Sequence, residues 1–163
     1  MFAAGASVLL PSCFNLEKKG SLSSKNIPLS EDDELLLQDL CEVIIPESDT
    51  PGAKKLGLHL FVLKMVNECR PERERQSFIE GLQEFRLATE DRLKRQFIQS
   101  ADSEKEAILE DLESQKFGGN IASFYNTLKQ ELVKGYINSE YFMTEIRPYK
   151  LVPGGYEPRV KIG

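Results

Sequence analysis

The stretch 42–62, EVIIPESDTPGAKKLGLHLFV, places two prolines, a cap-forming triplet and two glycines between two apolar helical runs. Pro46 ends the first run, because a proline inside a helix removes a hydrogen bond and clashes with the preceding turn. Asp49 or Thr50 can cap a new helix, and Pro51 suits its first position, where no amide hydrogen is needed. The stretch therefore predicts a corner made of helix, stop, short helix, stop and helix.

The short helix of this corner is expected over residues 52–57, where Gly57 ends it. A phosphate-binding loop is not indicated, because the Gly-x4-Gly-Lys-Ser/Thr pattern is absent from the sequence. The corner is therefore interpreted as a structural turn between helices.

The helix before the corner begins at Ser30. Ser30 and Asp33 have the spacing of a capping box, and four acidic residues fill the first turn, where negative charge meets the positive end of the helix dipole. Apolar residues then recur at helical spacing up to Ile44. The acidic cluster is therefore interpreted as a helix start and not as a metal site.

The remainder of the chain also has helical periodicity. Apolar residues three or four positions apart predict further helices over residues 58–69, 72–99, 104–114 and 121–137. We expect Ser103 with Glu106 to cap the third of these helices and Asn120 to cap the fourth. After Gly135 the periodicity decays. The predicted fold is all-α, a compact multi-helix domain over residues 30–163 with an irregular C-terminal tail.

Composition limits the function. The 163 residues are 40% hydrophobic and 29% charged, which is ordinary for a globular domain. The net charge of −5 and the absence of a basic run argue against nucleic acid as a partner. Because Trp is absent, Phe is expected to supply most of the aromatic core.

The N-terminus is unlike the rest of the chain. Residues 2–10 are apolar or small, they end in LPSC at 10–13, and a polar linker follows over 14–29. Residues 1–13 therefore resemble the end of an export signal with a lipobox, in which Cys13 would be lipidated. The alternative is a helix packed on the domain. No basic residue precedes the apolar run, so an internal start at Met1 would place the basic region upstream.

The other two cysteines, Cys41 and Cys69, lie within apolar helical patterns. Buried free thiols are expected, because a free cysteine usually behaves as a small hydrophobic residue. A Cys41–Cys69 disulfide is the alternative, and it would require an oxidising compartment.

No catalytic, cofactor-binding or metal-binding residue is predicted in this chain. The single histidine, His59, lies between leucines and is interpreted as structural, because no orienting acid can be assigned to it. The sequence contains no GxSxG, HExxH or GxGxxG motif. An enzyme that uses His59 and a carboxylate remains a less favoured alternative.

Two motifs resemble the gluconate 2-dehydrogenase subunit 3 family. The first is Ile-Pro-x-x-Asp-Thr-Pro-Gly-Ala followed by Gly, found here over residues 45–57. The second is Gly-Tyr-x-x-Ser-Glu at 135–140, followed by Tyr149 and by Val-Pro-Gly-Gly-Tyr at 152–156. The chain departs from the family pattern at 141–142, where Tyr-Phe stands instead of an early Gly, and at Glu157-Pro158 instead of Gly-Cys.

The resemblance implies a non-catalytic small subunit of a periplasmic, membrane-associated sugar or alcohol dehydrogenase. It implies that FAD is carried by a large subunit of the glucose-methanol-choline type and that haem c is carried by a third, cytochrome c subunit. It further implies twin-arginine export and a role in maturation of the large subunit. The alternative is a stand-alone cell-envelope lipoprotein with the same fold and no dehydrogenase partner.

The partner is expected to bind the C-terminal segment 136–156, which is rich in aromatic residues and proline. The predicted contact residues are Tyr136, Tyr149, Pro153 and Tyr156. Tyrosine is favoured at interfaces, because it buries an apolar ring while its hydroxyl finds a polar partner. The alternative is that these rings cover the domain's own core.

Overall fold

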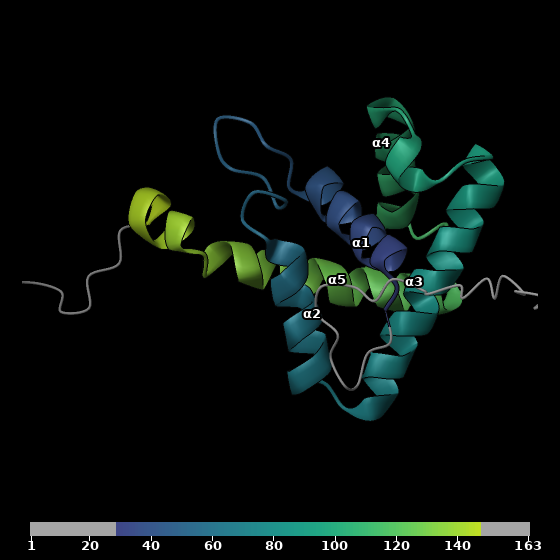
Figure 1. Ribbon diagram of the computed structural model, residues 1–163, viewed down its shortest axis with the longest axis horizontal. Helices are drawn as coiled ribbons and strands as arrows, with labels where there is room; N and C mark the ends of the chain where they lie inside the picture. Colours follow the sequence, from purple (N-terminus) through teal and green to yellow (C-terminus); the bar gives the residue numbers. More distant parts are fainter. Residues whose placement is uncertain (1–28, 148–163) are drawn as a thin grey trace, which may run out of the picture.

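The structure, a computed structural model, describes residues 29–147. Within this range the chain forms five α-helices, a 3-10 turn and a turn of π-helix (Figure 1). They are α1 (Glu31–Ile44), α2 (Leu58–Cys69), α3 (Glu72–Leu93), η1 (Phe97–Gln99), α4 (Asp102–Glu113), α5 (Gly119–Ile137) and η2 (Phe142–Ile146). The all-α prediction is therefore confirmed. The export segment 1–13 and the linker over 14–28 lie outside the described residues.

The helices are arranged around α5. Helices α2 and α3 form a V that is joined at Arg70 and Pro71, and α5 crosses both arms of the V (Figure 1). Helix α1 contacts α2, α3 and α4. The C-terminal part of α5 extends beyond α2 and carries η2 at its end (Figure 1).

The centre of the core is a cluster of phenylalanine rings. Phe78 and Phe85 of α3 pack on Phe124 of α5, with ring centroids 4.9 Å and 6.1 Å apart, and Phe97 packs on Phe85 at 5.7 Å. All four side chains are almost completely buried. The expectation that Phe supplies the aromatic core is therefore confirmed.

Gly81 brings α3 and α5 close together at this crossing. A Cβ atom at Gly81 would lie 2.5 Å from the Cβ of Phe124 and would also overlap the carbonyl oxygen of Asn120. Real Cβ atoms do not approach other atoms so closely, so a residue with a side chain would push the two helices apart. Gly81 thus sets the depth at which the Phe rings interlock.

Helix α1 begins as predicted. The hydroxyl of Ser30 accepts a hydrogen bond from the backbone N–H of Asp33 (3.1 Å) and donates to the Asp33 carboxylate (2.7 Å). Asp33 also pairs with Arg86 of α3 (3.4 Å). The acidic start of α1 therefore caps the helix and attaches it to α3.

The predicted caps of the later helices are wrong. Ser103 lies inside the first turn of α4, and the helix is instead capped by Glu104, which accepts from the backbone N–H of Ala101 (2.9 Å). Helix α5 begins at Gly119 and has no side-chain cap. Gly119 has a φ of 61°, a left-handed conformation that glycine adopts easily because it has no Cβ atom. Because Asn120 does not cap the helix, its side-chain amide can donate a hydrogen bond to the carboxylate of Glu84 on α3 (2.7 Å).

Helix α3 is shorter than the periodicity predicted. It ends at Leu93, because Lys94 adopts the left-handed conformation with φ 56°, and the buried ring of Phe97 comes from η1. The spacing of apolar residues did not distinguish a continuous helix from a helix followed by a tight turn that buries the same face.

Candidate interaction surface

The corner loop, residues 45–57, is held by the carboxylate of Glu42 near the end of α1. One carboxylate oxygen accepts a hydrogen bond from the backbone N–H of Glu47 (2.9 Å), and the other accepts from the backbone N–H of Lys54 (2.7 Å). A single side chain thus fixes the loop near both of its ends. Because two backbone donors are satisfied at once, the loop has a defined shape although much of it is exposed to solvent.

The two glycines of the corner loop have separate roles. A Cβ atom at Gly52 would lie 2.5 Å from the backbone nitrogen of Glu47 and would overlap the Glu42 carboxylate. Gly57 has a φ of 62°, the left-handed conformation that favours glycine, and it is the residue at which α2 starts. Gly52 therefore makes room for the carboxylate, and Gly57 turns the chain into α2.

The short helix predicted inside the corner is not formed. Residues 53–57 make successive turns, with a hydrogen bond from the N–H of Leu58 to the carbonyl of Ala53 (3.0 Å). Thr50 does not cap a helix, and its carbonyl accepts from the N–H of Ser48 (3.0 Å). Glu42, reaching over from α1, takes the capping role that was expected from within the loop.

The role of Glu42 in holding the corner loop was not predicted from the sequence. A carboxylate in the last turn of a helix faces the negative end of the helix dipole, so it is unfavourable there unless another group uses it. The position of Glu42 in the last turn of α1 was therefore the feature of the sequence that could have indicated this role. Which backbone groups the carboxylate would bind could not be deduced without the path of the loop.

The second family motif begins where α5 crosses α2. A Cβ atom at Gly135 would lie 2.8 Å from the ring of Phe61, so glycine lets this half-buried ring pack on the α5 backbone. Beyond this crossing the last turn of α5 and η2 form a projecting segment, which we call the α5–η2 arm (residues 133–147) (Figure 1).

Ser139 and Tyr136 join the two halves of the arm. The Ser139 hydroxyl donates to the carbonyl of Tyr136 (2.7 Å) and accepts from the N–H of Phe142 (3.2 Å). The rings of Tyr136 and Phe142 meet edge to face with centroids 5.7 Å apart. The described part of the arm therefore has regular structure up to Ile146, whereas the apolar spacing predicted a helix that ends at residue 137.

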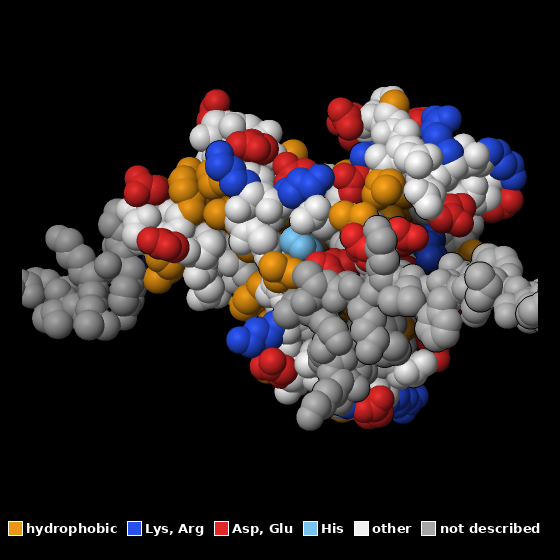
Figure 2. All heavy atoms as spheres, in the orientation of Figure 1, with side chains coloured by type: hydrophobic (Ala, Val, Ile, Leu, Met, Phe, Trp, Pro, Cys, Tyr) orange, Lys and Arg blue, Asp and Glu red, His pale blue; other side chains and the backbone are white. Residues whose placement is uncertain are grey.

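The arm exposes large apolar side chains. Val133 and Ile137 are 45% and 43% exposed and lie one helical turn apart, on the side of α5 away from Gly135. Ile146 is 49% exposed. Hydrophobic side chains gather between η2 and the corner loop, on the left of Figure 2. The first family motif and residues 135–140 of the second thus lie at one end of the described structure, opposite α4 (Figure 1).

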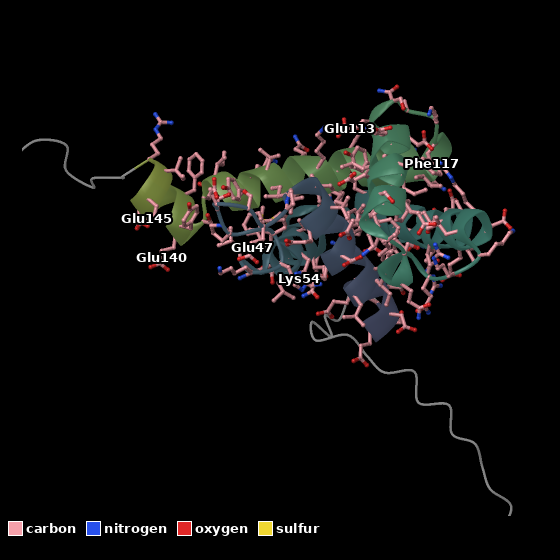
Figure 3. The ribbon with its side chains drawn as sticks, turned by 90° about the horizontal axis from the view of Figure 1, so that it is seen from above. Glu47, Lys54, Glu113, Phe117, Glu140 and Glu145 are labelled. Atoms are coloured by element: carbon pink, nitrogen blue, oxygen red, sulfur yellow. The ribbon has the colours of Figure 1, made fainter. Side chains whose placement is uncertain are left out.

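Acidic side chains accompany this apolar surface. Glu140 and Glu145 lie on the arm, Glu47 lies next along the molecule, and Glu113 lies farther from the arm (Figure 3). Glu47 is paired with Lys55 (2.8 Å), whereas Glu140, Glu145 and Asp49 have no ion pair or side-chain hydrogen bond within residues 29–147. The corner loop and the arm also contain Lys54, Lys55, Lys134 and Arg147, so this end of the molecule combines exposed apolar groups with charges of both signs.

Only one predicted contact residue falls within the described range. Tyr136 is partly buried and packs against the core, while its ring also contacts Phe142 in η2. Tyr149, Pro153 and Tyr156 lie outside the described residues, as does Cys13, the predicted lipidation site. Tyr136 thus links the core to the arm.

His59 is buried between α1 and α2. Its Nε2 lies 3.4 Å from the side-chain nitrogen of Gln38, and its Nδ1 has no hydrogen-bond partner. Burial lowers the pKa of His59; Glu34 opposes this shift and Lys54 adds to it. Burial therefore favours the neutral form of the ring.

The two described cysteines are free thiols, so the disulfide alternative is wrong for this structure. Cys41 is buried, and burial raises the pKa of its thiol. Cys69 is exposed at the end of α2, which corrects the expectation that it is buried.

Two other kinds of site are absent from residues 29–147. No group of three or more His, Cys, Asp or Glu side chains is arranged there to hold a metal ion. None of the helices in that range combines the length and apolar character that a membrane span needs.

The fold and the surface define a small all-α domain with exposed apolar side chains at the end of α5 and in η2. The chain belongs to the family described as gluconate 2-dehydrogenase subunit 3, which it matches over residues 31–154. No curated protein and no solved structure matched it. The family match covers the first motif, the second motif as far as Gly154, and every described helix, so the resemblance drawn from those motifs is confirmed.

Proposed function

We propose that the chain is a non-catalytic accessory subunit of a flavin-dependent sugar or alcohol dehydrogenase. The observation that carries this proposal is the family match over residues 31–154. A subunit of a dehydrogenase complex needs a surface for another subunit, and the end that bears the corner loop and residues 135–140 has exposed apolar side chains. The role proposed is maturation, export or stabilisation of the large subunit.

The cofactors of this complex are assigned to its other subunits. The large subunit would be a flavoprotein of the glucose-methanol-choline type that carries FAD, and a cytochrome c subunit with haem c would accept the electrons. This chain would contribute binding surface, including Tyr136 and the downstream residues Tyr149, Pro153 and Tyr156.

The proposed location is the periplasm, with attachment to the membrane. The apolar segment before Cys13 supports export and lipidation. Coding sequence upstream of Met1 is expected to specify an Arg-Arg pair. Labelling cells with a fatty-acid analogue should mark the wild-type chain and leave Cys13→Ser unmarked. Equal labelling of the two proteins would exclude Cys13 as the anchor.

Capture of the intact complex tests the proposed function. The full chain, tagged after Gly163, is recovered from detergent-solubilised membranes of its own host. We expect a flavoprotein to co-elute and to reduce a dye when a sugar or alcohol substrate is added. Deleting the gene should remove that activity, and re-supplying it should restore the activity. Recovery of the tagged chain alone, with dehydrogenase activity unchanged by the deletion, would instead favour the stand-alone lipoprotein.

A further inference from the structure

We propose that the C-terminal segment, residues 148–163, folds back on the last two turns of α5 and covers Val133 and Ile137. The proposal concerns a contact within the chain, so it can fail or succeed independently of the accessory function stated above. It assigns an occupant to an apolar surface that the other described residues leave exposed.

The surface is one side of the last two turns of α5. Val133 and Ile137 are 45% and 43% exposed, and they lie one helical turn apart. Each is about 160° around the helix from Gly135, the residue that meets Phe61 of α2. Two large apolar side chains therefore share the side of α5 that faces away from α2.

This apolar surface is confined to the end of α5. Asn126 and Gln130 precede Val133 and Ile137 on the same side of the helix, and both are exposed polar residues. A cover is therefore needed only beside the last two turns. The described structure ends at Arg147, ten positions after Ile137, so the C-terminal segment starts close to the surface that lacks a cover.

The C-terminal segment has the length and composition to provide this cover. When extended it can span about 50 Å, whereas the 14 positions from Val133 to Arg147 rise only about 21 Å even as a continuous helix. The family match continues to Gly154, so the first part of the segment belongs to the same matched domain as the helices. Its large apolar residues are Tyr149, Leu151, Val152, Tyr156, Val160 and Ile162.

Attachment to the arm favours this segment over a second copy of the chain as the occupant. A segment tethered next to its site has an effective concentration on the order of 1 mM, which is roughly a thousandfold above that of a second copy present at about 1 μM. Pro148, Pro153 and Pro158 restrict the backbone of the segment, which reduces the entropy that it loses on binding. A contact of a few apolar groups is therefore sufficient to hold it on α5.

The segment can cover α5 and still contact the flavoprotein subunit. In an extended chain successive side chains face opposite sides, so Leu151 and Val152 would face different ways. One side of the segment would lie on α5, and the other side would stay available to the partner.

Limited trypsin digestion of the isolated full chain tests the contact. Trypsin cuts after Lys150, whereas the bond after Arg147 is resistant because Pro148 follows it. Cleavage after Lys150 should be at least about tenfold slower in the full chain than in a synthetic peptide of residues 146–156, because cleavage depends on the fraction of the segment that is released. Mass spectrometry of the fragments follows that single bond.

Substitutions on α5 locate the contact. Ile137→Asp and Val133→Asp should each bring cleavage after Lys150 to within about twofold of the rate in the peptide, because a charged group in the contact releases the segment. Ile137→Leu should keep the protection. Leu87→Asp is the matched control, since Leu87 on α3 is 62% exposed and lies away from α5's last turns. Melting temperatures close to that of the wild type show that the variants remain folded, and Val133→Asp decides the question if Ile137→Asp does not fold.

Three results would overturn the proposal. Cleavage after Lys150 as fast in the wild type as in the peptide would show that the segment is not held. Protection that survives both Ile137→Asp and Val133→Asp, or that is lost equally in Leu87→Asp, would place the segment elsewhere. Protection that falls when the chain is diluted would assign the surface of α5 to a second copy.

Discussion

The middle and the end of α5 belong to one helix but have different environments. In the middle, Phe124 and Leu128 are completely buried against α3 and the rings of the Phe cluster. At the end, Val133 and Ile137 are exposed, and only one side of the helix is covered, where Gly135 meets Phe61. The difference indicates that the first part of α5 stabilises the domain, while the last part presents a surface.

The two close helix crossings differ in the same way. At Gly81 an added Cβ would meet a backbone carbonyl and the Cβ of Phe124, neither of which can move without shifting a helix. At Gly135 it would meet the ring of Phe61, a half-buried side chain that can rotate. The crossing in the core is therefore rigid, and the crossing next to the arm can adapt.

Replacing one phenylalanine in each region by alanine should give the largest difference in unfolding free energy between the two regions. Phe124→Ala leaves a cavity in the Phe cluster and should cost about 3–5 kcal/mol of unfolding free energy. Phe142→Ala removes a half-buried ring whose main aromatic contact is Tyr136, and it should cost less than about 1.5 kcal/mol. Chemical denaturation of both variants measures the difference. Equal losses would show that the arm is part of the core.

Replacing the glycine at each helix crossing by alanine should give a smaller difference in stability. Gly81→Ala should destabilise the domain by about 1–3 kcal/mol, because a methyl group is forced against fixed atoms. Gly135→Ala should change stability by no more than about 1 kcal/mol, since the better helix propensity of alanine offsets the displacement of Phe61. Thermal melts of the two variants measure this difference. A larger loss of stability for Gly135→Ala than for Gly81→Ala would contradict the view that the crossing in the core is the more rigid one.

The helical framework could be predicted because each helix buries one periodic face. The corner between α1 and α2 could be located from Pro46 and Gly57, and the Ser30 cap from its spacing to Asp33. These signals are local, and they depend on the backbone conformations and hydrogen bonds that individual residues favour.

The candidate surface could be predicted only in part. Tyr136 was expected there from composition, but the exposure of Val133 and Ile137 depends on how far α5 extends past α2. The apolar spacing of α5 gives no measure of that distance. The link between Glu42 and the corner loop was likewise hidden, because the hydrogen bond to Lys54 joins residues 12 positions apart across a non-repetitive turn.

Glu42→Gln should loosen the corner loop with only a small loss of global stability. The amide keeps one good acceptor, so one of the two backbone N–H groups loses its charged partner, at a cost of about 1 kcal/mol for a solvent-accessible site. Hydrogen exchange at the amides of Glu47 and Lys54 should accelerate, while exchange in the middle of α5 stays unchanged. Glu110→Gln, an exposed change on α4, is the control. Unchanged exchange at both loop amides would mean that Glu42 does not hold the loop.

The smallest expected effect concerns His59 on α2, the helix that connects the two regions. His59 faces α1, and Phe61, two positions later, packs next to Gly135 of α5. The pKa of His59 is lowered in the folded state by burial, so the unfolded chain takes up a proton first as the pH falls. The stability contribution is fully present above the unfolded pKa of 6.5 and is lost as the pH falls from there through the lowered folded pKa. His59→Gln should therefore reduce the slope of stability against pH in that window. The hydrogen bonds from Lys116 and Arg92 lower the pKa of Asp111. Burial raises the pKa of Glu131, but the hydrogen bonds from Arg70 and Lys134 outweigh it and lower the pKa overall. Both carboxylates therefore act at more acidic pH and should be unaffected. An identical slope in both proteins would show that His59 does not titrate there, and the fall in stability would have to originate in the carboxylates.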